Sequence, residues 1–334
     1  MQVLAPIYGL TDAAAEGQRL ERAGIDGAFT FEGPHDVFLP LAVAAAATDL
    51  SLMSNVAIAF PRNAVHLAHA AWDLQLLSGR RFTLGLGTQI RTHIERRFGE
   101  EFDRPVDRMR DTVDAVRAIF ATWQDGAPLD HRGPYRTHTL MSPVFSPPRT
   151  ELPPPAVVVG GLGPKMCEMA AEVADGLAVM PVTSEEFFAE RTLPSVQRGL
   201  ARRDDARGEF EVLPELILCV GRTPEEQAVA DAGCRGLLGF YSSTPAYRPV
   251  FETVGRGDLQ PVARTYTREG RWAELGDLID EHVLSTIAVR GTPTQVAEQI
   301  RRRYGAHTDR VAVYTPYEMP HDLLVEIIDA LHAV

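Results

Sequence analysis

Cysteine, long apolar runs and a leader segment are scarce or missing in this sequence of 334 residues. The three cysteines, Cys167, Cys219 and Cys234, lie far apart without C-x-x-C spacing, so neither a disulfide framework nor a zinc site is predicted. No apolar stretch reaches the roughly 20 residues that a membrane-spanning helix needs. No signal peptide precedes the first strand-like run. We therefore expect a cytoplasmic protein without a membrane partner.

The sequence also has fewer basic than acidic residues and lacks several catalytic motifs. Lysine and arginine number 33 against 45 acidic residues, and the net charge of −12 argues against nucleic acid as a partner. The sequence contains no G-x-S-x-G, no P-loop and no H-E-x-x-H, so nucleophilic hydrolysis, nucleotide hydrolysis and zinc chemistry lose support. His66 and His69 lie three apart on a predicted outer helix without a carboxylate neighbour, so we expect no metal site. The partner class that remains is a small-molecule substrate.

What the sequence does contain is a regular alternation of apolar strands and helices. Short connections between them predict parallel strands with helices outside. A chain of this length fits one α/β barrel, so the expected fold class is α/β, a (β/α)8 TIM-like barrel with insertions. The predicted strands are residues 3–8, 25–31, 53–60, 82–86, 156–160, 177–180, 211–220 and 310–314. The predicted helices between them include residues 185–203 and 224–238.

Two longer segments interrupt the alternation. The excursion at about 125–155 is rich in Pro, Gly and His and is too long for a simple connection, so we expect either an ordered excursion with a hairpin or a loose surface loop. The segment at about 240–289 does not fit one strand–helix unit, and we interpret it as an insertion before the last strand. Residues 1–334 together are expected to form a single domain.

The segment from Arg81 to Gly99 holds a short apolar strand that opens into a polar loop. Gly85 and Gly87 remove side chains where another group must come close to the backbone. In a parallel barrel, sites are built at the carboxyl ends of strands such as this one. The alternative interpretation is a strand packed tightly against its neighbour, followed by a surface loop.

Three glycines at the end of a later strand predict an anion site. In Gly160-Gly161-Leu162-Gly163, backbone N–H groups can approach a ligand without an intervening Cβ. The helix that follows presents the positive end of its dipole, which favours phosphate. The spacing is not the dinucleotide fingerprint, because the next glycine is Gly176. The alternative is a tight strand-to-helix turn.

His35 lies in a loop that the barrel would place at its active face. A histidine can act as acid or base near neutral pH. Glu32 and Asp36 flank it in sequence and would favour its protonated form if they were close. A surface or packing role is the alternative.

Several segments resemble the bacterial luciferase-like flavin and deazaflavin oxidoreductases. Residues 76–88 resemble the family segment L-S-G-G-R-F-x-L-G-x-G, and residues 30–36 resemble the strand-two loop of its coenzyme F420-dependent branch. Residues 161–164, with Ala-Asp-Gly at 174–176, resemble the phosphate loop and the turn after it. Residues 291–300 resemble the segment that precedes the last strand. The similarity extends over nearly the whole chain.

The resemblance implies a barrel that binds F420 or FMN at its carboxyl face, and of the two we expect F420, in a hydride-transferring oxidoreductase. It implies a catalytic or cofactor-contacting role for His35, with Glu32 as its partner, and a homodimer. It also implies a bulge around residues 57–60, where the family often has a non-proline cis peptide. The implied cofactor-binding residues are Ala57, Ile58, Ala59, Phe60, Thr88, Gln89, His93, Gly160, Gly161, Leu162 and Gly163.

One departure from the family leaves the substrate open. F420-dependent sugar-phosphate dehydrogenases carry a glutamate in the strand-four loop, where this sequence has Ile90. Two alternative functions also remain: an FMN-dependent monooxygenase fed by a separate reductase, and a non-catalytic flavin- or deazaflavin-binding protein.

Overall fold

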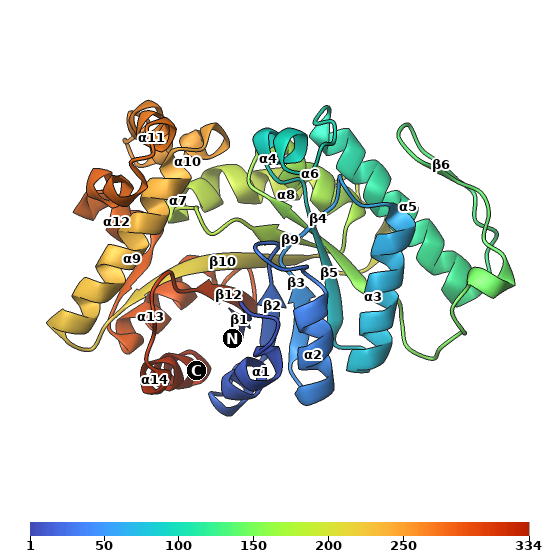
Figure 1. The fold of residues 1–334 in the computed structure, drawn as a ribbon, viewed down its shortest axis with the longest axis horizontal. Helices are drawn as coiled ribbons and strands as arrows, with labels where there is room; N and C mark the ends of the chain where they lie inside the picture. The colour runs from blue at the N-terminus through green and yellow to red at the C-terminus, as the bar shows by residue number, and fades with distance from the viewer. Residues whose placement is uncertain (334) are drawn as a thin grey trace.

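Eight parallel strands close into a barrel, which confirms the predicted fold class. The computed structural model describes residues 1–333. Neighbouring strands pair in parallel, and the barrel closes where β10 pairs with both β9 and β12. Helices surround the strands (Figure 1). The barrel strands are β1 (Gln2–Pro6), β2 (Gly27–Thr30), β3 (Ser51–Ser54), β5 (Phe82–Gly87), β8 (Ala156–Gly161), β9 (Gly176–Val179), β10 (Glu211–Val220) and β12 (Arg310–Tyr314).

The helices bury their apolar faces against the outer side of the barrel and form the largest core cluster. Local capping sets several of their ends: the Asn63 side chain accepts a hydrogen bond from the Val65 N–H at the start of α3, and left-handed Gly79 ends it. Among residues 1–333, no helix combines the length and apolar composition needed to cross a bilayer. The outer helices are α1 (Ala13–Arg22), α2 (Leu39–Ala47), α3 (Ala64–Ser78), α4 (Arg91–Arg96), α5 (Pro105–Asp125), α6 (Pro164–Val173), α7 (Glu185–Phe187), α8 (Leu193–Leu200), α13 (Pro293–Tyr304) and α14 (His321–His332).

The inside of the barrel is filled by side chains that alternate with the outward-facing ones. Because side chains along a strand point to opposite faces, one residue in two is directed inward. Most barrel strands contribute one fully buried apolar residue to this layer. Its members are Leu4, Phe29, Met53, Val158, Ala178, Leu213 and Ala312.

The predicted insertion is a group of helices over one end of the barrel. The group begins before the predicted boundary at about residue 240, with α9 (Pro224–Ser242), which was expected as a separate helix ending at Leu238. It continues through α10 (Arg248–Thr253), α11 (Leu259–Arg268) and α12 (Glu281–Ile287). Figure 1 shows these helices gathered beyond the carboxyl end of β10. Short β11 (Val289–Gly291) then pairs with the end of β10 and returns the chain to the barrel.

The excursion contains the predicted hairpin, β6 (His131–Arg132) and β7 (Thr137–His138), which stands beside α5 (Figure 1). Asp111, a buried residue of α5, lies 3.1 Å from His131 Nε2. A Cβ at Gly133 would overlap the Asp111 carboxylate, so glycine lets the hairpin turn approach α5. The hairpin is therefore ordered by contacts to the barrel's outer helix.

Two predicted elements are divided in the structure. The strand expected over 53–60 stops at Ser54; a cis peptide joins Asn55 to Val56, and a two-residue strand, β4 (Ala57–Ile58), follows. The kink thus lies just before the expected segment 57–60. The helix expected over 185–203 consists of α7, a π-helical turn (Phe188–Thr192) and α8.

The glycines of β5 make room for this divided strand. A Cβ at Gly85 would overlap the Ser54 carbonyl oxygen, and a Cβ at Gly87 would overlap the Val56 side chain. The group that was expected to approach the β5 backbone is therefore the neighbouring strand. Ser54 also joins the two strands directly, because its hydroxyl donates to the Gly85 carbonyl at 2.9 Å.

Replacing Gly85 with alanine should destabilise the fold by about 1–3 kcal/mol, since the added methyl meets backbone that cannot move alone. Gly236→Ala is the matched control: it lies in α9 with nothing within 4 Å of a built Cβ, so alanine should be neutral or stabilise by up to about 1 kcal/mol. Urea unfolding of both variants measures the difference. Equal midpoints for Gly85→Ala and the wild type would contradict the packing argument.

Candidate active site

Three aromatic rings meet at the carboxyl ends of adjacent barrel strands. Tyr8 follows β1, Phe31 follows β2 and Tyr314 ends β12. Their ring centroids lie 5.9 to 6.3 Å apart in edge-to-face arrangements, the geometry that aromatic pairs favour. All three retain accessible surface, so they line the mouth of the barrel above the buried inner layer.

Glu215 is the carboxylate of this mouth, and sequence reasoning missed it. It lies two residues beyond inward-facing Leu213 on β10 and therefore points to the same side. Asn55 Nδ2 donates to Glu215 Oε2 at 3.2 Å. Oε1 accepts no hydrogen bond from residues 1–333, and Glu215 is half-buried and keeps some accessible surface. The only sequence signal was an acidic residue in the middle of a largely apolar strand.

The surroundings of Glu215 are neutral and aromatic. Burial raises the pKa of its carboxyl to about 8, and the hydrogen bond from Asn55 opposes that shift only partly. Burial, together with the charge of Glu215, raises the pKa of Tyr8 and Tyr314, and that of Tyr247 to about 12. The pKa of Tyr241 is raised by the same two causes. Glu215 is thus predominantly protonated at neutral pH among four neutral phenols.

The loop after β2 is organised by Arg62. Its guanidinium lies 2.6 Å from Glu32 Oε2 and 3.3 Å from Asp36 Oδ2. Glu32 Oε2 also accepts a hydrogen bond from the Ile58 N–H at 2.9 Å. Glu32 and Asp36 therefore bind Arg62, and no hydrogen bond among residues 1–333 joins either of them to His35. The His35 side chain is exposed at the tip of this loop.

The predicted segment Ala57, Ile58, Ala59 and Phe60 is fully buried beneath this loop. Ala57 and Ile58 pair with β5, and the Phe60 ring packs against Phe102 at 5.8 Å. Val56 instead keeps part of its surface accessible, with its side chain over the bare backbone at Gly87 and Gly160. The surface at the kink is therefore presented by Val56, one residue before the predicted segment.

Thr88, Gln89 and His93 lie together in the turn from β5 into α4. The Thr88 hydroxyl donates to the Gln89 carbonyl, and Gln89 adopts a left-handed φ of 57° while its side chain accepts from the Ile90 N–H. The Nδ1 atom of His93 is buried without a hydrogen-bond partner among residues 1–333. A buried polar atom without a partner is unusual, and a ligand that bonds to it would remove that cost.

The glycine loop forms the expected approach to a helix N-terminus. Gly160 and Gly161 end β8, while the Leu162 side chain packs among the insertion helices. Gly163 is the N-cap of α6, is exposed, and has nothing within 4 Å of a built Cβ. The first N–H groups of a helix have no partner inside it, and no side chain caps α6. These residues fit an anionic group such as a cofactor phosphate.

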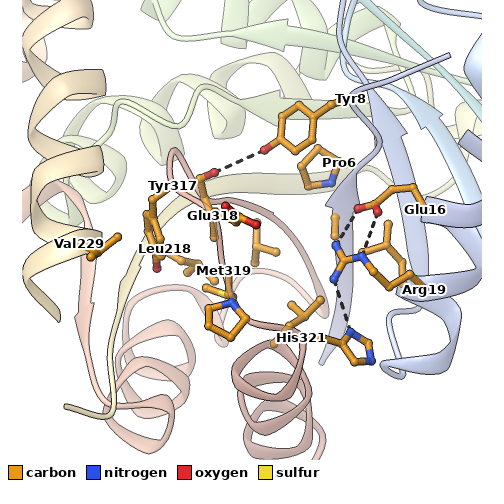
Figure 2. A pocket seen from close by; sticks show the side chains of 16 residues that line it. Pro6, Tyr8, Glu16, Arg19, Leu218, Val229, Tyr317, Glu318, Met319 and His321 are labelled. Carbon is orange, nitrogen blue, oxygen red and sulfur yellow. Dashed lines mark hydrogen bonds and ion pairs between the residues drawn. The ribbon is translucent and has the colours of Figure 1, made fainter. Parts of the chain in front are cut away.

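A groove of about 740 Å³ lies on the outside of the barrel and shares Tyr8 with the mouth (Figure 2). Its floor includes outward-facing Ala5, Leu218 and Val313, and its rim includes the Glu16–Arg19 ion pair. None of the predicted site residues lines it. The carboxyl ends of the strands, and not this groove, bring together the glycine loop, the aromatic rings and Glu215.

The fold is an α/β barrel, and its polar and glycine-lined groups at the strand ends make that face the candidate active site. The family model described as luciferase-like monooxygenase matches residues 3–310, and the chain belongs to this oxidoreductase family. The chain is 43% identical to the uncharacterized protein Rv1360 of Mycobacterium tuberculosis, over 90% of this chain and 89% of that one. It is 26% identical to the putative coenzyme F420-dependent oxidoreductase Rv3520c of the same organism, over 84% of each.

The fold is similar to that of the coenzyme F420-dependent tetrahydromethanopterin reductase of Methanopyrus kandleri. The TM-score is 0.81 at 16% sequence identity, covering 99% of this chain and 98% of that one. This likeness confirms the barrel fold, and the family model confirms the resemblance to luciferase-like proteins seen in the sequence.

Replacing Arg62 with methionine should lower the unfolding free energy by about 1–3 kcal/mol, because the largely buried Glu32 carboxylate loses its ionic partner. The matched control is Arg91→Met, which removes the exposed pair with Glu95 and should cost less than about 0.5 kcal/mol. Chemical denaturation of both variants gives the comparison. A loss at Arg62 no larger than that at Arg91 would show that the loop does not depend on this pair.

The raised pKa of Glu215 makes stability depend on pH. The ordinary pKa of a glutamate is 4.5, and the pKa of Glu215 in the folded protein is about 8. Between these two pH values the unfolded chain loses the proton while the folded protein keeps it, so stability should fall as pH rises. Glu215→Gln should remove roughly 2–4 kcal/mol of that fall, since one pKa unit corresponds to about 1.4 kcal/mol. Unfolding of both proteins at pH 5 and pH 8.5 tests this. Parallel pH curves would contradict a raised pKa.

Proposed function

We propose that this protein is an F420-dependent oxidoreductase that transfers a hydride between the deazaflavin and a small organic substrate. The observation that carries the proposal is the shared location of an uncapped, glycine-lined helix N-terminus and an aromatic mouth with a protonatable carboxylate. The first fits the anionic tail of a cofactor, and the second provides a substrate site beside its ring. The 26% identity to a putative F420-dependent oxidoreductase supports this choice of cofactor.

Different residues would bind different parts of the cofactor. The backbone at Gly161 and Gly163, with the start of α6, would hold the cofactor phosphate. Val56 would support one face of the ring, and the unpaired Nδ1 of His93 would offer it a hydrogen-bonding atom. When bound, F420 supplies or accepts the hydride. His35 would contact the ring or move a proton from the exposed tip of its loop.

The second candidate is an FMN-dependent monooxygenase, which the family description favours. FMN also carries a phosphate that the glycine loop could hold, so the loop alone does not separate the two cofactors. Reduced FMN reacts with oxygen, and reduced F420 does so poorly, so oxygen consumption with each cofactor separates the activities. A non-catalytic binding protein would bind tightly without turnover, and His35→Ala would then change affinity alone. The homodimer stays a prediction.

Fluorescence titration should show F420 binding at least tenfold more tightly than FMN. Gly163→Asp should weaken F420 binding at least tenfold, because it adds a negative charge at the phosphate position. The fold should tolerate the change, since aspartate is a preferred N-cap residue and the site has free space.

Gly163→Asn is the matched control, because asparagine has the same shape and capping ability without the charge. We expect it to keep F420 affinity within about threefold of the wild type. Tighter binding of FMN would favour the monooxygenase, and binding of neither cofactor would overturn the proposed function. Equal F420 affinities of the Asp and Asn variants would show that the cofactor phosphate does not bind at this loop.

A further inference from the structure

We propose that Glu215 is the residue that holds the substrate and exchanges a proton with it, and that the substrate is a small uncharged carbonyl compound or the corresponding alcohol. This inference rests on the proposed function for its hydride step, and it names the substrate class of the same site. It begins with the position of Glu215 on β10, directed into the mouth of the barrel.

One oxygen of Glu215 is fixed and the other is available. Asn55, at the end of β3, donates from Nδ2 to Oε2 and so orients the carboxyl group across the barrel. Oε1 has no hydrogen-bond partner among residues 1–333, and the residue keeps some accessible surface. A carboxylic acid held in this way can donate one hydrogen bond to a ligand oxygen. The geometry thus presents a single donor to whatever enters the mouth.

The walls around this donor come from four elements and are aromatic. Tyr8 and Tyr314 stand at the ends of β1 and β12, and Tyr241 and Tyr247 come from α9 and the helical turn after it. The rings of Tyr241 and Tyr247 meet edge to face at 5.5 Å. These phenols are the titratable groups that interact with Glu215, and they are neutral at neutral pH because burial raises the pKa of each above its ordinary value of 10.

The absence of positive charge near Glu215 decides the substrate class. No ion pair among residues 1–333 includes Glu215, and the groups that act on its pKa contain no arginine, lysine or histidine. A phosphorylated or carboxylated substrate would find no cation here and would lose its hydration without compensation. A neutral compound with one polar oxygen and an apolar body satisfies both the acid and the rings.

The reaction balances with the reduced deazaflavin as the named co-reactant. In reduction, the carbonyl carbon gains a hydride and its oxygen gains the Glu215 proton, leaving an alcohol, the Glu215 carboxylate and the oxidised cofactor. Solvent then returns a proton to the carboxylate. In the reverse direction the carboxylate accepts the hydroxyl proton while the carbon loses its hydride. Glu215 therefore works as acid in one direction and as base in the other.

Binding of six-membered-ring probes to the cofactor-free protein tests the assignment by saturation-transfer NMR. At pH 6.5, cyclohexanone should bind at least fivefold more tightly than cyclohexylammonium or cyclohexanecarboxylate. Its affinity should fall at least tenfold between pH 6.5 and 9.5, as Glu215 loses its donor proton. In Glu215→Gln the amide still donates, so the affinity should be independent of pH. Preferred binding of the ammonium, or a pH-dependent Gln variant, would overturn the assignment.

The cofactor-loaded protein tests proton transfer separately. With reduced F420 and cyclohexanone, Glu215→Gln should lower kcat at least 100-fold while KM changes less than threefold. Glu211→Gln is the matched control: it lies on the same strand, pairs with Arg310 at the opposite end, and should leave both constants unchanged. Unchanged kcat in Glu215→Gln, or no reduction by a wild type that binds both compounds, would overturn the role in proton transfer. Failure to bind F420 would instead refute the proposed function, and the probe titrations would still stand.

Discussion

The close approach of the third strand to β5 determines the shape of the barrel mouth. The Ser54 carbonyl occupies the space that a side chain at Gly85 would need, and Val56 occupies the space beside Gly87. This approach places Asn55 where it can reach Glu215 across the barrel. It also brings the Ile58 N–H to the Glu32 carboxylate. The proposed substrate site and the β2 loop are therefore both positioned by the close approach that Gly85 and Gly87 allow.

The sequence predicted the barrel because periodicity reports burial, and burial dominates the fold. Strands buried on both faces appear as apolar runs, and helices as one-sided patterns. The glycines of β5 were a correct sign of close approach, but a single sequence cannot say what approaches. A neighbouring strand and a ligand both require a residue without a side chain at the point of contact. Only the structure shows that Ser54 and Val56 fill that space.

The candidate site was less predictable, because it depends on contacts between distant residues. Glu32 seemed a partner for His35 by proximity in sequence, yet it binds Arg62, thirty residues away. Glu215 lies 160 residues from its partner Asn55, and its environment includes two tyrosines from the insertion. Local patterns describe strands, helices and turns, and they contain no information about such pairs. The glycine loop was found because its meaning is local: a strand end, bare backbone and a helix start.

The origin of the aromatic walls has a consequence for how this protein can diversify. Tyr8 and Tyr314 belong to the barrel framework, whereas Tyr241 and Tyr247 belong to helices added outside it. Half of the proposed substrate site can therefore be rebuilt by exchanging surface helices, while the strand pairing and the glycine loop stay intact. Natural variants that retain Glu215 but accept molecules of other sizes are expected to differ first in this segment.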